Sequence, residues 1–308
     1  MGPLGVHAPD RAFGLAAGEW TAATEWTAAR ERSASSRPVS SCMALTSLRL
    51  PEQQPEAGFP LNLPLLTGAT EVALDTGVTI LVGENGSGKS TLLEALALAT
   101  EVPTVGSNDD AQLDSTLSHL LPLANDLRLT WTQRSRRGLF MRAEDYFGYV
   151  QRQRRMVQDL RSEAARVAAE AAGQHEGERR RRMGPFAGSA AAMDARYQGD
   201  LDHRSHGQSF LAFCKGRFTG AGLYLLDEPE AALSPVSQLG FLALVKETVE
   251  RGAQFVIATH SPVLMAYPGA LIYQLEGVGL APTPYDELEH VKTMREFLAA
   301  PEAFTRYL

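Results

Sequence analysis

Nine residues, 83–91, constrain the fold of this chain more than any other stretch. They read Gly-Glu-Asn-Gly-Ser-Gly-Lys-Ser-Thr and fit the pattern G-x-x-x-x-G-K-[ST]. An apolar, β-branched run over 78–82 precedes them, and a helical pattern over 91–99 follows. A strand, a glycine-rich loop and a helix together wrap backbone N–H groups and a helix N-terminus around phosphate. The sequence therefore predicts a loop that holds the phosphates of a nucleotide.

Each position of this loop has an expected role in binding ATP together with Mg²⁺. Lys89 is expected to reach the β- and γ-phosphates, and the Ser90 hydroxyl is expected to ligate Mg²⁺. The predicted nucleotide contacts are Gly83, Glu84, Asn85, Gly86, Ser87, Gly88, Lys89, Ser90 and Thr91.

Two acids follow a second apolar run, Leu223 to Leu226. Ligands of open α/β sheets bind at the carboxyl ends of the strands, so this position favours a functional role. Asp227 is expected to hold Mg²⁺, directly or through water. Glu228 points the other way if the chain is still extended there, toward the γ-phosphate and an attacking water, which predicts a general base or a residue that orients the water.

A histidine, His260, ends the next predicted strand, 254–259. One helix and one strand separate it from Asp227, so a neighbouring strand places it beside the same phosphate. We expect His260 to hydrogen-bond the γ-phosphate and to respond to its loss.

Strand and helix patterns alternate over the second half of the chain, which predicts an α/β fold with a largely parallel sheet. Short apolar runs over 44–82 predict β structure before the loop, and two further strands are expected at 127–132 and 139–142. A helical, arginine-rich insertion is expected at 145–200, with a Gly/Ala/Ser-rich link after Arg179 to Arg182. The remaining expected elements are helices at 207–218, 235–249 and 286–299, the last with Asp286 as its N-cap, and a strand at 271–275.

Composition limits the classes of protein that this chain can belong to. Its 308 residues are 44% hydrophobic and carry a net charge of −7, so the chain as a whole does not coat nucleic acid. Residues 128–217 are locally basic, with 18 Lys and Arg against 10 Asp and Glu. The two cysteines, Cys42 and Cys214, form no disulfide or zinc pattern. With no apolar run of transmembrane length and no leader pattern, we expect a cytoplasmic protein without membrane insertion.

The N-terminal 42 residues carry no strand or helix period, and we expect a disordered extension there. The patterned sequence begins at Met43. We therefore divide the chain into the extension, 1–42, and a nucleotide-binding domain, 43–308, in which 101–205 contains the helical insertion.

The order of these motifs resembles that of the ABC-type ATPases, which include transporter nucleotide-binding domains and SMC proteins. A signature loop completes the family order. The residues that match it here are Ser205, Gly207 and Gln208, whereas Arg204 and His206 depart from the family pattern. The resemblance implies that this loop caps the γ-phosphate bound by a partner subunit. The family also has a glutamine-containing Q-loop, and its place in this chain stays open. Arg142-Ala143-Glu144 follows a strand at about the right point, and Gln133 and Gln151 are the alternatives.

A narrower resemblance is to small, stand-alone bacterial ATPases of the AAA_21-like group, over roughly 45–308. It rests on five stretches, 83–91, 142–147, 205–210, 223–235 and 258–262, followed by Tyr267-Pro268-Gly269. The resemblance implies ATP binding and hydrolysis, with Lys89, Glu228 and His260 as the catalytic residues.

Three functions remain open at this point. The first is an ATPase working as an ATP-sandwich homodimer that drives a conformational clamp. The second is the ATP-binding subunit of a transporter, which needs a separate membrane partner. The third is an ATPase of DNA repair or phage defence, in which Arg152, Arg154, Arg155 and Arg179 to Arg182 track a nucleic-acid backbone.

Overall fold

The structure is a computed structural model that describes residues 45–67, 71–105, 115–171, 173, 175–196, 206–275 and 279–306. The chain divides into two units, Met1–Val39 and Ser40–Leu308, and all described residues belong to the second. The predicted extension 1–42 lies outside the described residues, as does Ser205 of the signature loop.

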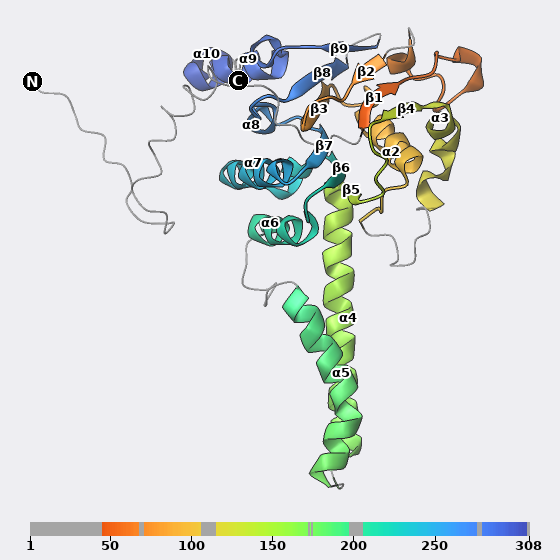
Figure 1. Ribbon diagram of the computed structural model, residues 1–308. Coiled ribbons are helices and arrows are strands. Elements are labelled where there is room, and N and C mark those ends of the chain that lie inside the picture. Colours follow the sequence, from red (N-terminus) through yellow and green to blue (C-terminus); the bar gives the residue numbers. More distant parts are fainter. Residues whose placement is uncertain are drawn as a thin grey trace, which may run out of the picture. The chain divides into compact units, whose positions relative to one another are not determined.

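A six-stranded sheet forms the centre of the second unit, in the order β5-β6-β7-β3-β8-β9 (Figure 1). Neighbouring strands are parallel from β5 to β8, and β9 alone of these six runs antiparallel, against β8. The predicted α/β fold with a mostly parallel sheet is therefore confirmed. Its strands are β3 (Val78–Gly83), β5 (Gly138–Arg142), β6 (Gly222–Asp227), β7 (Ala253–Ala258), β8 (Leu271–Leu275) and β9 (Leu280–Pro282).

Helices cover both faces of this sheet, because successive strand residues point to opposite sides. Leu225 of β6 faces a core built around α2, whereas Leu226 faces a core that contains Phe210 of α6 and Phe241 of α7. The helices described are α2 (Lys89–Thr100), α3 (Leu121–Asp126), α4 (Ala143–Glu170), α5 (Glu176–Arg196), α6 (His206–Arg217), α7 (Pro235–Glu250), α8 (Pro262–Met265), α9 (Glu289–Ala299) and α10 (Pro301–Thr305). Short 3₁₀ turns are η2 (Pro55–Ala57), η3 (Pro64–Leu66), η4 (Ser115–Leu120), η5 (Pro229–Ala232) and η6 (Tyr285–Glu287).

A second, antiparallel sheet contains β2 (Glu71–Ala73), β1 (Leu45–Arg49) and β4 (Arg128–Trp131) in that order. One buried side chain, Gln254 of β7, ties it to the central sheet. Its amide donates to the carbonyls of Leu45 and Leu74 at 2.7 Å each, and its oxygen accepts from the Leu45 N–H at 3.1 Å. These three bonds satisfy backbone groups that burial would otherwise leave unpaired.

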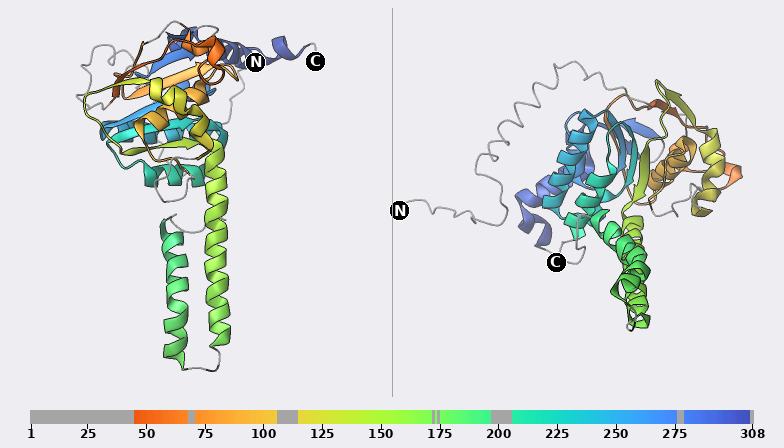
Figure 2. Two further views of the ribbon diagram at one scale, coloured as in Figure 1. Left: turned by 90° about the vertical axis from the view of Figure 1, so that its right-hand side faces the viewer. Right: turned by 60° about the horizontal axis from the view of Figure 1, so that its bottom comes forward.

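The insertion between the phosphate loop and α6 is a helical hairpin, in which α4 and α5 lie side by side (Figure 2). At 1.5 Å per residue, the 28 residues of α4 extend about 42 Å. The Gly/Ala/Ser-rich link predicted after Arg182 is wrong, because α5 continues to Arg196. Alanine is the best helix former, and small side chains such as Ala164 and Ala190 are buried in the hairpin, so this composition forms a packed helix.

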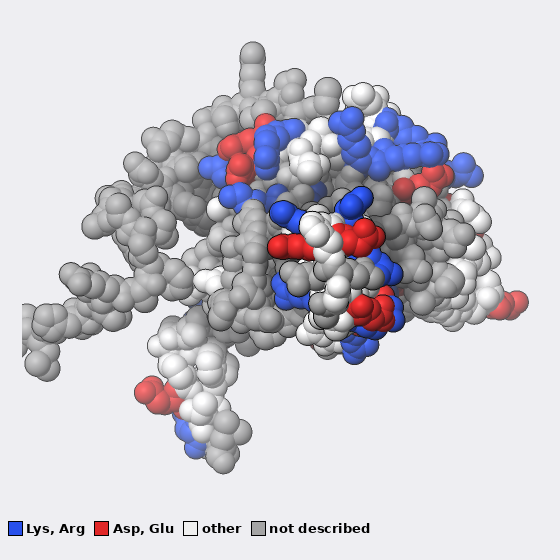
Figure 3. Space-filling model, turned by 90° about the horizontal axis from the view of Figure 1, so that it is seen from below, with Lys and Arg blue, Asp and Glu red and all other residues white. Residues whose placement is uncertain are grey.

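Charged side chains of both signs are interspersed on the face seen from below (Figure 3). Within the hairpin, Arg166 pairs with Glu163 and Glu170 of α4, and Arg181 lies 3.8 Å from Glu178 of α5. Such local pairing uses part of the positive charge that a nucleic-acid backbone requires. Nucleic-acid binding through this insertion therefore stays a prediction.

The helix predicted at 286–299 begins later than the sequence pattern indicates. Asp286 is not an N-cap, because 285–287 form the 3₁₀ turn η6 and α9 starts at Glu289. The Asp286 carboxylate instead pairs with Arg295 at 2.9 Å, which fastens the turn to the helix. Among the helices that the structure describes, none combines the length and the apolar character needed to cross a bilayer.

Candidate nucleotide-binding site

The phosphate loop connects the end of β3 to the start of α2. Gly88 takes a φ of 96°, and a Cβ there would lie 2.2 Å from a methyl carbon of Leu65, so only glycine fits without movement. Gly88 is also the N-cap of α2, and no side chain caps that helix. The unpaired N–H groups of its first turn and the helix dipole therefore favour an anion at this end.

Lys89 is buried within the loop, with 4% of its surface exposed. Its Nζ donates to the carbonyl oxygens of Gly83 at 2.8 Å and Glu84 at 2.9 Å. Desolvation by burial lowers the pKa of Lys89, while the nearby carboxylates of Glu228, Asp227 and Glu230 act in the opposite direction. The ammonium thus bonds the loop backbone and lies near the acids at the end of β6, while its contact with the β- and γ-phosphates stays a prediction.

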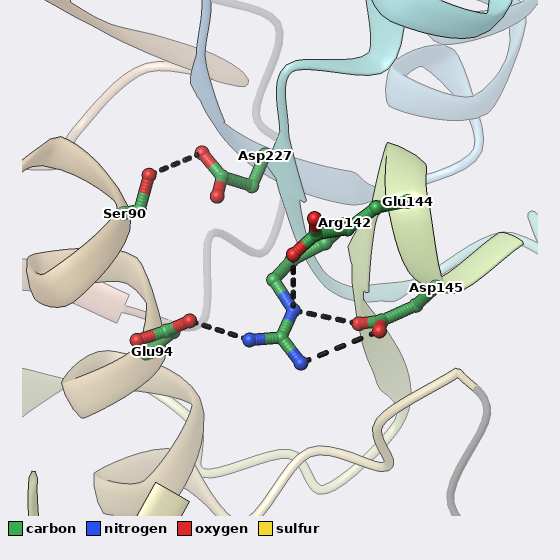
Figure 4. Close-up of polar contacts among 6 residues, drawn as sticks. All are labelled: Ser90, Glu94, Arg142, Glu144, Asp145 and Asp227. Atoms are coloured by element: carbon green, nitrogen blue, oxygen red, sulfur yellow. Dashed lines mark hydrogen bonds and ion pairs between the residues drawn. The ribbon is translucent and has the colours of Figure 1, made fainter. Parts of the chain in front are cut away.

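The two predicted Mg²⁺ ligands come together in the structure. The Ser90 hydroxyl on α2 donates to Oδ1 of Asp227, at the end of β6, over 3.2 Å (Figure 4). Among the described residues, no group of three or more His, Cys, Asp and Glu side chains is placed to hold a metal alone. One hydroxyl and one carboxylate fit Mg²⁺, which takes few protein ligands and the rest from phosphates and water.

Burial of Asp227 determines how its charge affects stability. Its pKa rises from an ordinary 3.8 to about 6, chiefly through burial, while the hydrogen bond from Ser90 opposes the rise. The folded state therefore prefers the protonated acid. The stability that the protonated Asp227 gives the folded state is fully present below pH 3.8 and is lost as the pH rises through about 6.

We expect Asp227→Asn to stabilise the ligand-free protein at pH 8, because the uncharged amide removes a desolvated charge. A pKa shift of about two units corresponds to ~3 kcal/mol at most, so a gain of roughly 1–3 kcal/mol is expected. The gain should disappear at pH 4. Urea unfolding at both pH values measures it, with the exposed Asp126→Asn as control. A variant less stable than the parent at pH 8 contradicts this account.

Glu228 does not continue the strand, contrary to the extended conformation that the sequence prediction assumed. Its φ and ψ are both 48°, a left-handed conformation that non-glycine residues seldom adopt. Its N–H still donates to the Ala258 carbonyl at 2.9 Å, and Pro229 then begins the turn η5. The turn, rather than strand alternation, directs the Glu228 side chain, which is 45% exposed and lies 3.7 Å from His260 Nε2.

His260 follows β7, next to β6, as predicted. The Glu230 side chain holds its backbone, since Glu230 Oε1 accepts from the His260 N–H at 2.6 Å. Burial lowers the pKa of His260, Lys89 lowers it further, and Glu228 raises it. His260 and Glu228 therefore face each other at the edge of the site that also holds Lys89.

The remaining signature residues lie on a different helix from the phosphate loop. Gly207 is at the start of α6, where a Cβ would come within 3.0 Å of the Ser237 hydroxyl of α7. Gln208, one residue on, is exposed. The helix α6 contacts α7 and the turn η5.

Arg142 ends β5, directly beside Asp227 in the register of the sheet, and connects three elements (Figure 4). Its guanidinium bonds Glu94 of α2 at 2.7 Å and Asp145 of α4 at 2.7 and 3.3 Å, and lies 3.9 Å from Glu144. The Arg142 and Glu94 side chains are 18% and 14% exposed. The arginine thereby joins the phosphate-loop helix to the root of the hairpin.

We expect Arg142→Met to lower the free energy of unfolding by about 2–4 kcal/mol at pH 8, because it leaves Glu94 as a buried charge without its partner. Burial already raises the pKa of Glu94 despite Arg142. Without Arg142 this carboxyl takes up a proton more readily, so the loss should shrink toward pH 5. Urea unfolding measures both values. The control, Arg166→Met, removes an arginine that is 62% exposed and should change little. Equal losses in the two variants contradict the account.

Comparison with known proteins yields two family-model matches that flank the insertion. Residues 65–128 match "AAA domain", and residues 209–266 match "AAA domain, putative AbiEii toxin, Type IV TA system". The first contains the phosphate loop and the second contains Asp227, Glu228 and His260. Each match covers one half of the candidate site.

A curated relative, the macrolide export ATP-binding/permease protein MacB of Photorhabdus laumondii, is 24% identical over 198 residues. The alignment covers 64% of this chain and 28% of that protein, so the chain spans under a third of its relative's length.

Solved structures of similar fold include the SMC head domain of Thermotoga maritima, with 14% identity and a TM-score of 0.40 over 79% of this chain and 100% of that chain. Another is an ATP-binding cassette of an ABC transporter in its ADP conformation. It has 15% identity and a TM-score of 0.44 over 86% of this chain and 98% of that chain.

Proposed function

We propose that this chain is an ABC-type P-loop ATPase that carries out the Mg²⁺-dependent hydrolysis of ATP to ADP and phosphate. One observation carries the proposal. The Ser90 hydroxyl of the phosphate loop and the Asp227 carboxylate of a separate strand meet at 3.2 Å, next to Lys89. Residues 137 positions apart in the sequence thus form the hydroxyl, carboxylate and ammonium set that a nucleoside triphosphate needs.

The residues of the site divide the work of hydrolysis among them. Lys89 and the N-terminus of α2 bind the phosphates, and Ser90 with Asp227 would hold Mg²⁺, which would supply positive charge to neutralise the phosphates. A water oxygen bonds to the γ-phosphorus, the bond from that phosphorus to the bridging oxygen breaks, and ADP leaves. Glu228 accepts the proton of the attacking water, and His260 contacts the γ-phosphate.

The proposal extends to an ATP-sandwich homodimer acting in the cytoplasm. Its support is the separation of the signature residues Gly207 and Gln208, on α6, from the phosphate loop on α2. The ABC-type resemblance assigns such residues to the γ-phosphate of the partner subunit. Binding of ATP then joins two chains, and hydrolysis releases them, so that the helical insertions of both chains move as a clamp.

A second function, the ATP-binding subunit of a transporter, is favoured by the similarity to the export protein MacB. That role requires a separate membrane protein as partner. ATP turnover that appears only when such a partner is added in lipid vesicles favours the transporter. Turnover by the chain alone favours the homodimer.

The proposal is tested by measuring thermal unfolding of the whole chain with ATP, with ATP and Mg²⁺, and with AMP. A ligand that binds the folded state alone stabilises it, by about 2.7 kcal/mol at a hundred times its dissociation constant. We expect stabilisation by ATP that Mg²⁺ strengthens and that AMP, which lacks β- and γ-phosphates, does not reproduce. Equal responses to AMP and ATP contradict a site built around Lys89.

A further inference from the structure

A second histidine, His290, lies against His260. It is the second residue of α9, and the two imidazole centroids are 5.7 Å apart with 56° between the ring planes. Two nearby residues are anchors of the core, since Leu288, two positions before it, is fully buried and Val291, the next residue, is 3% exposed. The start of α9 is therefore fixed, and His290 with it.

Both imidazoles carry a buried nitrogen that lacks a hydrogen-bond partner. In His260 this atom is Nε2, and in His290 it is Nδ1. His260 Nε2 is 3.7 Å from Glu228 Oε1, which is too far for a hydrogen bond. An unpaired buried polar atom costs about 1–3 kcal/mol, and two adjacent ones call for a functional reason.

The surroundings of His260 place these atoms at the phosphate end of the site. Lys89 of α2 acts on His260 electrostatically, and Glu228 at the end of β6 lies 3.7 Å from its Nε2. Glu230 of η5 accepts from its backbone N–H, and His290 of α9 lies against its ring. Two neighbouring imidazoles resist holding a proton each, because like charges at this distance repel. Burial, Lys89 and His290 all lower the pKa of His260, against the opposing effect of Glu228.

We propose that His290 is a positioning residue of the nucleotide site, which keeps the His260 imidazole neutral and oriented so that its Nε2 stays available for the γ-phosphate of ATP. His290 acts through His260 and is not itself assigned a contact with substrate. Packing of the two rings fixes the orientation of His260. Repulsion between like charges on the two imidazoles disfavours the protonated form of His260. This inference rests on the proposed hydrolysis of ATP for its catalytic part.

Titration of the histidine ring protons by NMR tests the inference without relying on turnover. The variant His290→Asn removes the imidazole that lies against His260, and we expect the pKa of His260 to move up toward its ordinary 6.5. His260→Gln identifies the His260 signal among the seven histidines. His175→Asn, at the exposed turn of the hairpin, is the matched control and should leave the signal unchanged. An unshifted His260 in His290→Asn overturns the inference.

Steady-state kinetics supply the second readout. For His290→Asn we expect kcat to fall roughly tenfold, with KM nearly unchanged, because the loss is one of orientation at the γ-phosphate. The acid limb of the kcat profile should move to higher pH, along with the pKa of His260. His290→Phe keeps a ring against His260 and should retain more kcat than His290→Asn. A purely structural role predicts the same pH profile in all variants, which contradicts the inference.

The two proposals fail in different ways. If the parent chain hydrolyses ATP and both His290 variants match it in kcat and pH profile, the inference about His290 is wrong and the proposed function stands. If the parent neither binds nor hydrolyses ATP, the proposed function is wrong, while the NMR titration still decides whether His290 controls His260.

Discussion

Lys89→Ala should abolish the stabilisation by ATP and lower ATP turnover by at least about a hundredfold. A charged donor at the transferring phosphoryl group contributes about 10² to 10³ in rate. The structure adds a reason for the loss of binding. The Lys89 ammonium is buried and bonds the carbonyls of Gly83 and Glu84, so it both shapes the loop and supplies the charge. Phosphate release and thermal shift with ATP are the measurements.

The control for this experiment is Lys246→Ala, which removes an exposed lysine of α7. It should bind and hydrolyse ATP like the parent chain. Because Lys89 also bonds the loop backbone, unfolding in the absence of nucleotide must be measured for each variant. Turnover that survives in a folded Lys89→Ala protein would place the active site elsewhere in the chain.

Glu228→Gln should bind ATP and fail to hydrolyse it, with a loss in turnover of about 10² to 10⁴. Glutamine has nearly the shape of glutamate, so the left-handed turn at this position and the contact with the Ala258 carbonyl are kept. What is lost is the carboxylate that accepts the proton of water. Single-turnover measurement of ADP formation tests this expectation.

The same variant tests the homodimer. With hydrolysis blocked, ATP should hold two chains together, so light scattering should report a rise from one 33.3 kDa chain to two on addition of Mg²⁺ and ATP. Glu247→Gln, an exposed glutamate of α7, should show no lasting dimer because it still turns ATP over. A Glu228→Gln protein that binds ATP and stays monomeric contradicts the sandwich arrangement, though not the site itself.

Much of the site could be predicted from the sequence because its parts are local or follow from sheet geometry. Gly83 to Ser90 form one continuous motif. Asp227 could be placed near Ser90 because the carboxyl ends of parallel strands lie at one edge of a sheet, and only β7 separates β6 from β3. His260 follows from the same argument, since β6 and β7 are neighbours.

Other features depend on tertiary contacts that no local pattern records. The ion pair between Arg142 and Glu94 joins residues 48 positions apart. An arginine or a glutamate in the sequence does not show which oppositely charged residue it will meet in the fold. The left-handed backbone of Glu228 arises where the strand must turn into Pro229, a bend that strand periodicity does not contain. His290 has no motif of its own. Its position beside His260 appears only when α9 packs onto the core through Leu288 and Val291.

In the hairpin, composition alone predicts the wrong structure. Glycine, serine and proline at 184–189 indicated a link, but the alanines around them favour helix. Packing of α5 against α4 then decides the outcome, because Ala190 is buried. The residues at 184–189 favour both a link and a helix, and the packing of α5 against α4 determines that they form a helix.

The most direct measurement of the central claim is phosphate release from ATP by the parent chain, with Mg²⁺, at several protein concentrations and beside Lys89→Ala. The account predicts turnover that requires Mg²⁺, vanishes in the variant and rises more steeply than protein concentration, because two chains complete each site. Release that is absent from the parent, or equal in the parent and the variant, contradicts the account.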